Sequence, residues 1–200
     1  MSPTHLAMAL LLGLGLSAST GLNTFLPLLL LSAAARFHVA GITLGDRFEW
    51  LTSDAAMIAL IIACVLELVA DKIPAVDHFL DSAGTFVRPV AGALASASVL
   101  TGVDPMVAAI VGIIVGAPTS FGMHTLKAGT RVASSATTFG CANPVISIIE
   151  DVISFALSVL SIFIPFLVPF ALAALVWLLW RVMKRIRRGS AVTAAPPPAG

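Results

Sequence analysis

Long apolar stretches alternate with short polar ones along this chain. The apolar stretches cover Leu6–Ala35, Ala55–Ala70, Pro89–Val103, Pro105–Met123 and Pro144–Trp180. A helix needs about 20 apolar residues to cross a hydrocarbon core of about 30 Å. The first stretch would be about 45 Å long as one straight helix, so we expect it to be tilted, kinked or broken. The last would be about 60 Å long, so we expect two helices that meet at the prolines Pro165 and Pro169.

This pattern predicts an all-α, polytopic integral membrane protein with about six transmembrane helices. Val76–Thr85 mixes acids with apolar residues, which is typical of a short interfacial or re-entrant helix. Arg36–Trp50 is expected to form a loop. Residues 1–188 are predicted to be a single transmembrane domain, and 189–200, which end in Pro-Pro-Pro-Ala-Gly, a disordered cytoplasmic tail.

The first apolar stretch resembles a signal peptide in part, but we expect it to be retained. No Lys or Arg precedes it, and it continues well past Ser17–Ser19, where a cleavage site would lie. An even number of helices places both termini on one side of the membrane. The basic residues that follow the last helix put that side in the cytoplasm, and they are Arg181, Lys184, Arg185, Arg187 and Arg188.

Composition excludes an ordinary soluble domain, because 58% of the residues are hydrophobic and only 10% are charged. Soluble domains have about a quarter of their residues charged. A net charge of +1 gives no field that would attract nucleic acid. Cys64 and Cys141 make neither a disulfide framework nor a metal-ligand spacing. We therefore expect the lipid bilayer as a partner, no nucleic acid, no metal and no cofactor.

Four of the ten acids lie between Glu67 and Arg88, beside apolar segments. Charged groups near hydrocarbon are costly and usually face each other, a cavity or water. Glu67 and Asp71 share a helix face because they are four residues apart. Two carboxylates in low-dielectric surroundings can act as a proton carrier or a cation site. The alternative is that Lys72 or Arg88 neutralises them in a structural ion pair.

Two further groups of polar residues allow a functional and a structural interpretation. Asp77 and His78 suit a proton relay, although a His beside an acid is also common at the water edge. Arg88, Lys127 and Arg131 could hold a phosphate or a lipid head group. They also fit the ordinary excess of positive charge on the cytoplasmic side.

Two stretches, Gly15–Thr24 and Gly116–Thr125, are similar and predict two helix breaks. They coincide without gaps at Gly15 and Gly116, Ser19 and Ser120, Gly21 and Gly122, and Thr24 and Thr125. An acid pair follows each, Glu67 with Asp71 and Glu150 with Asp151. If the two stretches belong to a repeat, each half of the chain has three helices, and the odd number inverts the second half relative to the first. Inverted repeats of this kind are a transporter architecture. Small polar membrane segments also match by chance.

The side chains at the two breaks have two interpretations. Asn23, Thr24, His124 and Thr125 would line the breaks, where freed backbone groups need a cavity or partners. Alternatively, these side chains satisfy the kinks and bind nothing.

Several segments resemble a known family. They are Ala70–His78, which reads Ala-Asp-Lys-Ile-Pro-Ala-Val-Asp-His, together with Phe86–Leu94, Gly21–Pro27 and Glu150–Val152. These segments resemble the bacterial membrane family called domain of unknown function 4126. The resemblance covers about Leu6 to Arg188 and implies a small multi-pass protein of the bacterial inner membrane. It implies no reaction.

Three functional hypotheses remain open, and the first is favoured. A transporter- or flippase-like protein would move a small molecule, ion or lipid between the two breaks, with Glu67, Asp71, Glu150 and Asp151 as coupling or cation sites. A membrane enzyme would act on a phosphorylated lipid head group through Asp71, Asp77, His78 and Arg88. A non-catalytic scaffold would pack through small-residue faces, as a homo-oligomer or with other proteins.

Overall fold

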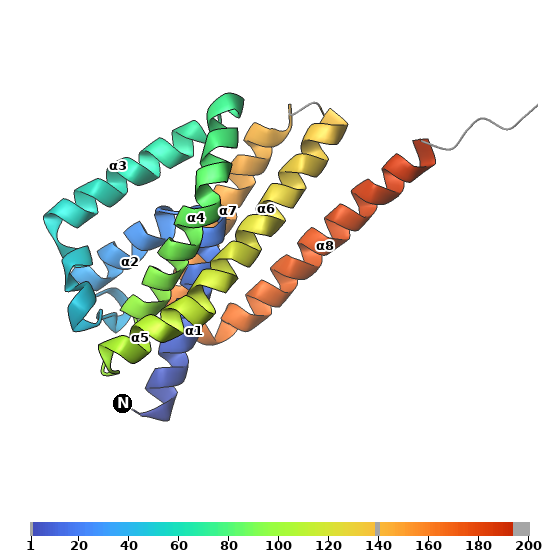
Figure 1. Ribbon diagram of the computed structural model, residues 1–200. Coiled ribbons are helices and arrows are strands. Elements are labelled where there is room, and N and C mark those ends of the chain that lie inside the picture. Colours follow the sequence, from blue (N-terminus) through green and yellow to red (C-terminus); the bar gives the residue numbers. More distant parts are fainter. Residues whose placement is uncertain (1, 139–140, 194–200) are drawn as a thin grey trace, which may run out of the picture.

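The computed structural model describes residues 2–138 and 141–193, without the side chains of 74, 75, 77–79, 136, 137, 182, 183 and 185–193. Within these residues every regular element is helical, as predicted (Figure 1). The elements are α1 (Pro3–Leu22), α2 (Leu26–Arg36), η1 (Val39–Gly41), η2 (Asp46–Thr52), α3 (Asp54–Ala70), α4 (Pro74–Ser98), α5 (Pro105–Val111), η3 (Gly112–Gly116), α6 (Ala117–Thr138), α7 (Asn143–Phe163), η4 (Pro165–Leu167) and α8 (Val168–Thr193).

The first two helices form a hairpin that returns to the end of the bundle where it began. Figure 1 shows α1 rising from the N-terminal end and α2 running back toward that end. At the far end of α2, Arg36 pairs with Asp54 at the start of α3. α3 then runs antiparallel to α2, so that Glu67 near its end meets the hairpin at Thr24. The hairpin tip, residues 23–25, therefore lies part-way along the bundle.

The remaining helices pack closely around α1 through small residues. A Cβ at Gly13 would lie 2.9 Å from Ser96 Oγ on α4, and one at Gly15 would overlap Ser161 of α7. Between α4 and η3, a Cβ at Gly116 would overlap the carbonyl oxygen of Gly92. Small residues let helix backbones approach this closely. α7 ends before Pro165 and α8 begins after it, which confirms the predicted hairpin between them.

Two predicted segments prove to be one helix. Val76–Thr85 and the stretch that begins at Pro89 both belong to α4, which continues through Pro89. Proline removes one backbone donor, but a helix packed on its neighbours tolerates this loss. Neighbouring helices hold α4 on both sides of Pro89: Ser17 Oγ donates to the carbonyl oxygen of Gly92, at 2.7 Å, and Ser120 Oγ donates to that of Arg88, at 2.8 Å. The prediction of a separate short helix was wrong.

The termini also differ from the prediction of a shared side. The start of α1 and the end of α8 lie at opposite ends of the bundle (Figure 1). The physical reason is that Leu6–Ala35 is a hairpin whose two arms end on one side, rather than a single crossing. Of the predicted disordered tail, residues 189–193 continue α8, and 194–200 lie outside the described residues.

Among the described residues, three helical segments are long and apolar enough to cross a membrane: Pro3–Leu22, Pro105–Ser135 and Asn143–Phe163. The pair η2 and α3, bent by 64° at its break, would make a fourth. This is fewer than the six predicted. α4 carries Asp81 and Arg88, and α2 has only 11 residues.

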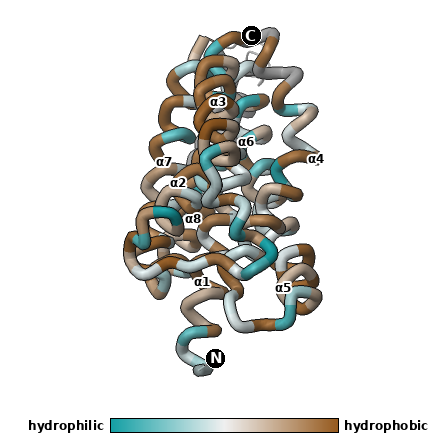
Figure 2. The backbone as a smooth tube through the Cα atoms, turned by 90° about the vertical axis from the view of Figure 1, so that its left-hand side faces the viewer, coloured by the Kyte–Doolittle hydropathy of each residue, from teal (hydrophilic) through white to brown (hydrophobic). Residues whose placement is uncertain are grey.

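Many large apolar side chains are exposed. Figure 2 shows hydrophobic residues along α3, and the most exposed large side chains include Leu66, Phe86, Val90, Val132 and Phe170. Arg88, Lys127 and Arg131 are instead buried. Together with the apolar helices, this distribution is compatible with a membrane protein.

Candidate functional site

The tip of the α1–α2 hairpin is capped by the carboxylate of Glu67. The backbone N–H of Thr24 lies 2.9 Å from both Glu67 oxygens, and the Thr24 hydroxyl donates to Oε1 at 2.8 Å. The N–H of Phe25 donates to Oε2 at 3.1 Å. These donors belong to the N-terminal end of α2, where the helix dipole favours a negative charge. Glu67 therefore supplies the anion that this helix end attracts.

The chain breaks at Asn23 and Thr24, at the end of the first predicted break, whereas Ser19 and Gly21 lie inside α1. α1 continues through Ser19 and Gly21 to Leu22, and Asn23 is extended. The N–H of Leu26 donates to Asn23 Oδ1 at 3.0 Å. The Asn23 side chain thus accepts a hydrogen bond from the freed backbone and also donates one to Asp151, while the Thr24 hydroxyl donates to Glu67.

Arg88 connects the tip to α6. Its Nη2 lies 3.5 Å from Glu67 Oε1, and its Nη1 donates to the carbonyl oxygen of Gly21, at 3.1 Å, and to His124 Nδ1, at 3.0 Å. An arginine N–H only donates, so Nδ1 of His124 accepts. The proton of the neutral ring is then on Nε2, which lies 3.3 Å from the hydroxyl of Thr85. A chain of polar contacts therefore runs from Glu67 to Thr85.

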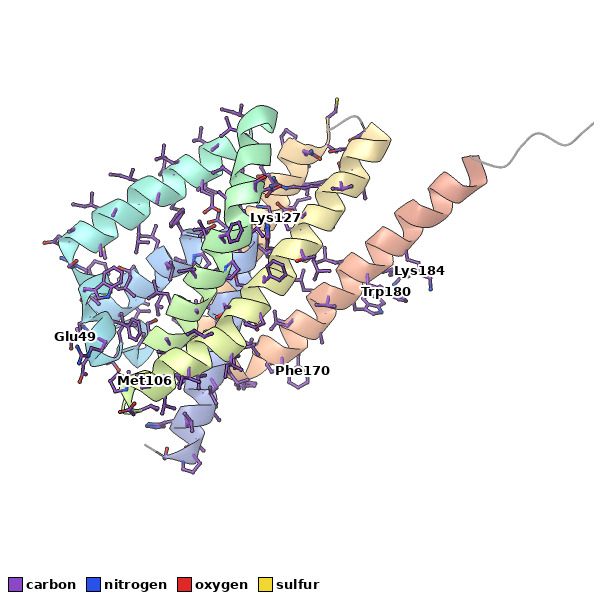
Figure 3. All side chains as sticks on the ribbon, viewed as in Figure 1. Glu49, Met106, Lys127, Phe170, Trp180 and Lys184 are labelled. Carbon is purple, nitrogen blue, oxygen red and sulfur yellow. The ribbon has the colours of Figure 1, made fainter. Side chains whose placement is uncertain are left out.

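A second group of charges lies next to the tip. Lys127 Nζ donates to the carbonyl oxygen of Leu22, at 2.8 Å, and lies 3.2 Å from Asp71 Oδ2 and 3.4 Å from Glu150 Oε2. Arg131 Nη2 is 2.8 Å from Glu150 Oε2 and 3.6 Å from Asp71 Oδ2. Figure 3 shows Lys127 within the bundle. Both cations are therefore shared between the same two buried acids.

A third ion pair ties the tip to α7. Lys72 Nζ lies 2.8 Å from Asp151 Oδ2 and 3.0 Å from the hydroxyl of Ser147. Asn23 Nδ2 donates to Asp151 Oδ1 at 3.0 Å. We call the following set the ion-pair layer: Glu67, Asp71, Lys72, Arg88, Lys127, Arg131, Glu150 and Asp151.

The ion-pair layer contains every predicted charged site residue whose side chain the structure describes. The side chains of Asp77 and His78 lie outside the described residues. Each acid of the layer faces at least one cation, with Glu67 beside Arg88 and Asp71 beside Lys127. Asp71 Oδ1 and Glu150 Oε1 are nevertheless buried without a hydrogen-bond partner among the described residues. The charges are thus largely paired, and some acceptor capacity is left unused.

The predicted second helix break was wrong. Ser120, Gly122, His124 and Thr125 all lie inside α6, which is continuous. The Thr125 hydroxyl donates to the carbonyl oxygen of Phe121, at 2.8 Å, within the helix. The nearest irregularity is η3, a π-helical turn that ends at Gly116. The two similar stretches do contact each other, because Thr20 Oγ1 donates to Ser120 Oγ at 3.0 Å.

Two cavities lie on different faces of α4. The polar cavity, of about 400 Å³, lies between α4, α6 and the start of α7 and is lined by Asp81, Ser82, Thr85, His124, Ala128, Arg131, Val132, Ser135 and Asn143. The apolar cavity, of about 300 Å³, lies between α2, α3 and α4 and is lined by Thr24, Phe25, Ala63, Leu66, Glu67, Ala70, Leu80, Ala83, Gly84 and Val87. The polar contacts through Arg88 join Glu67 in one wall to His124 in the other.

Sequence reasoning did not select five polar residues of the polar cavity. Asp81 lies in the acid-rich stretch, which was the one available signal for it. Ser82, Thr85, Ser135 and Asn143 are common residue types without a distinctive spacing. Among the described residues, no group of three His, Cys, Asp or Glu side chains could hold a metal ion.

Comparison with known proteins gives one match. The model of the family described as "Domain of unknown function (DUF4126)" matches residues 10–185. No curated protein and no solved structure matches the chain. Because the family model covers most of the chain, including the hairpin tip and the whole ion-pair layer, this chain belongs to the DUF4126 family.

Proposed function

We propose that this chain is a multi-pass protein of the bacterial inner membrane with a transporter- or flippase-like function. The observation that carries the proposal is the α1–α2 hairpin, whose broken tip is buried against charged side chains part-way along the bundle. Irregular backbone at membrane depth is tolerated where protein buries it or where it lines a cavity. Discontinuous helices of this kind form the substrate and ion sites of many transporters.

The ion-pair layer supports this proposal because its cations have more than one acid within reach. Lys127 lies between Asp71 and Glu150, and Arg131 contacts both of these and Asp81. A small shift of α6 would exchange these partners without leaving a charge unpaired. In this proposal the acids act as coupling sites, because they can pair with Lys127 and Arg131 both before and after the shift of α6. They do not act as open sites for a cation from solution.

The end of α8 suggests the orientation in the membrane. Arg181 stacks on Trp177 at 5.0 Å from the ring centre, and Lys184 on Trp180 at 4.6 Å. Tryptophan and basic residues mark the membrane interface, and an excess of basic residues marks the cytoplasmic side. In the proposed orientation this end is cytoplasmic, so the start of α1 lies on the opposite side.

A direct test is uptake by proteoliposomes that contain the purified full-length protein. Labelled small cations, anions and zwitterions would be offered to wild type, to Glu67→Gln and to Glu49→Gln, a control outside the ion-pair layer. We expect wild type and the control to accumulate at least one class of solute and Glu67→Gln to lose that uptake. Absence of uptake for every class would refute transport, and full uptake by Glu67→Gln would refute the coupling role of Glu67.

A lipid is the second candidate substrate, and the apolar cavity favours it. This cavity lies beside the exposed side chains of Leu66 and Val87, and Glu67 is part of its wall. An acyl chain could therefore enter from the side. A fluorescent lipid in the same proteoliposomes, bleached from outside by dithionite, would distinguish the two substrates. Bleaching beyond the outer leaflet with the protein, and not without it, would favour the flippase.

A further inference from the structure

The polar cavity offers buried acceptor atoms that no described residue satisfies. Asp81 Oδ1 and Asn143 Oδ1 are both buried without a hydrogen-bond partner in the described part of the chain, and both residues line this cavity. The other oxygen of Asp81 lies 3.6 Å from Arg131 Nη1. Asn143 Nδ2 already donates to the hydroxyl of Ser135 at 3.1 Å. Each of these oxygens is closed to solvent as it stands, so a rotation of the Asp81 carboxylate or the Asn143 amide would bring it to an occupant that donates hydrogen bonds.

The charges behind this cavity are unbalanced in the same direction. Arg131 and Lys127 face the three carboxylates of Asp71, Asp81 and Glu150, at 2.8 to 3.6 Å. The rest of the layer is balanced, since Glu67 faces Arg88 and Asp151 faces Lys72. Among the described side chains, the network thus contains one carboxylate more than it contains cations. A carboxylate without a cation of its own is costly in low-dielectric surroundings, so a cation is the occupant that this cavity favours.

We propose that the polar cavity binds a small solute through an ammonium group, with Asp81 as its counter-charge and Asn143 as a second acceptor. This inference rests on the proposed function and names the substrate class. An ammonium group has three donors for the two unsatisfied oxygens and a neighbouring hydroxyl. A cavity of about 400 Å³ is within the range of small-molecule sites.

An organic ammonium fits these residues better than a metal ion or an anion. Metal ions such as Ca²⁺ take six to eight oxygen ligands, and no group of three potential ligand side chains lies together in the described chain. An anion would need free donors, whereas the Arg131 guanidinium already faces three carboxylates.

The test measures the melting temperature of the purified full-length protein in detergent at constant ionic strength. The probes are ethanolamine, choline and sodium chloride. Ethanolamine has N–H donors and choline has the same charge without them. A ligand that binds the folded state raises the melting temperature by mass action. We expect ethanolamine to raise it in a saturable way, and choline and sodium to leave it unchanged.

Variants locate the site. Asp81→Asn should weaken ethanolamine binding at least tenfold, and Asn143→Ala several-fold. Asp54→Asn makes the same chemical change at an exposed position outside the cavity and should bind like wild type. If Asp81→Asn does not fold, Asn143→Ala decides the question. Equal shifts with choline or sodium, no shift with any probe, or unchanged affinity in a folded cavity variant would overturn the inference.

The result separates this inference from the proposed function. Binding that depends on Asp81, without uptake of ethanolamine into proteoliposomes, would support the site and refute transport of this solute class. Uptake of another solute without any ethanolamine binding would support transport and overturn only the assignment of an ammonium ligand.

Discussion

Gly15–Thr24 and Gly116–Thr125 share four residues at the same spacing, yet the chain breaks at the end of the first stretch and stays helical through the second. Thr24, at the end of the first stretch, donates two hydrogen bonds to Glu67. Thr125, at the end of the second, donates only to its own helix. Small polar residues permit a break, and the buried acid that caps the freed N–H groups determines where it forms.

Removal of Glu67 should have the largest effect on this difference. Glu67→Ala leaves the N–H groups of Thr24 and Phe25 without an acceptor and the buried Arg88 without its carboxylate. We expect a loss of about 5 kcal/mol in the free energy of unfolding, because removing one partner strands a buried charge. Chemical denaturation in detergent measures it. Glu67→Gln keeps an acceptor and should lose clearly less, so equal losses would contradict the capping role.

Loss of Lys127 should come next. Lys127→Met leaves Asp71 and Glu150 to Arg131 alone and frees the carbonyl oxygen of Leu22 at the tip. We expect destabilisation by about 3 kcal/mol. The double variant with Asp71→Asn should recover about 1 kcal/mol, since it removes an unpaired acid. Strictly additive losses in this double-mutant cycle would show that Lys127 and Asp71 are not coupled.

The aligned glycines Gly21 and Gly122 offer a matched pair. A Cβ at Gly21 would overlap the carbonyl oxygen of Ser120, whereas one at Gly122 would meet no atom within 4 Å. Gly21→Ala should therefore cost about 1 to 3 kcal/mol by overpacking. Gly122→Ala should stabilise α6 by about 0.5 to 1 kcal/mol, because alanine is the better helix former. Thermal melts of both variants would test this, and changes of the same sign would contradict it.

The aligned serines should show the smallest difference. Ser120 Oγ donates to the carbonyl oxygen of Arg88 on another helix, while Ser19 Oγ donates to Gly15 of its own helix. Ser120→Ala should cost about 0.6 kcal/mol, a typical value for hydrogen bonds between membrane helices. Ser19→Ala should be nearly neutral. Precise chemical denaturation of the two variants is the measurement, and a larger cost for Ser19→Ala would reverse the comparison.

Local signals in the sequence predicted much of the fold. The helical class, the hairpin at Pro165 and the break near Asn23 each follow from apolar length and from residues that disfavour a helix. The direction of the chain after the break does not follow. Whether α2 continues or turns back depends on the contact between Glu67 and Thr24, which are far apart in the chain. For this reason the described ends of the chain lie at opposite ends of the bundle rather than at one end (Figure 1).

The candidate site was predicted in its charged members but not in their pairing. Glu67 and Asp71 were expected to share a helix face, with Lys72 or Arg88 as the alternative partner in a structural ion pair. In the structure Glu67 faces Arg88, as in that alternative, whereas Asp71 faces Lys127 from α6. The pairing of cations and acids depends on how the helices pack. The spacing of residues within one segment carries no information about that packing. The polar cavity was missed because Ser135 and Asn143 are ordinary residues until α6 and α7 bring them beside Asp81.

The hairpin tip also constrains the order in which the protein can fold as it is synthesised. The tip leaves the ribosome early, but its partners come much later: Glu67 is 43 residues after Thr24, and Asp151 is 128 residues after Asn23. Lys127, which binds the carbonyl oxygen of Leu22, follows it by 105 residues. The α1–α2 hairpin can therefore acquire its full set of buried partners only after Asp151 of α7 has been made. The contacts of the hairpin tip are then completed late, although this segment is translated first.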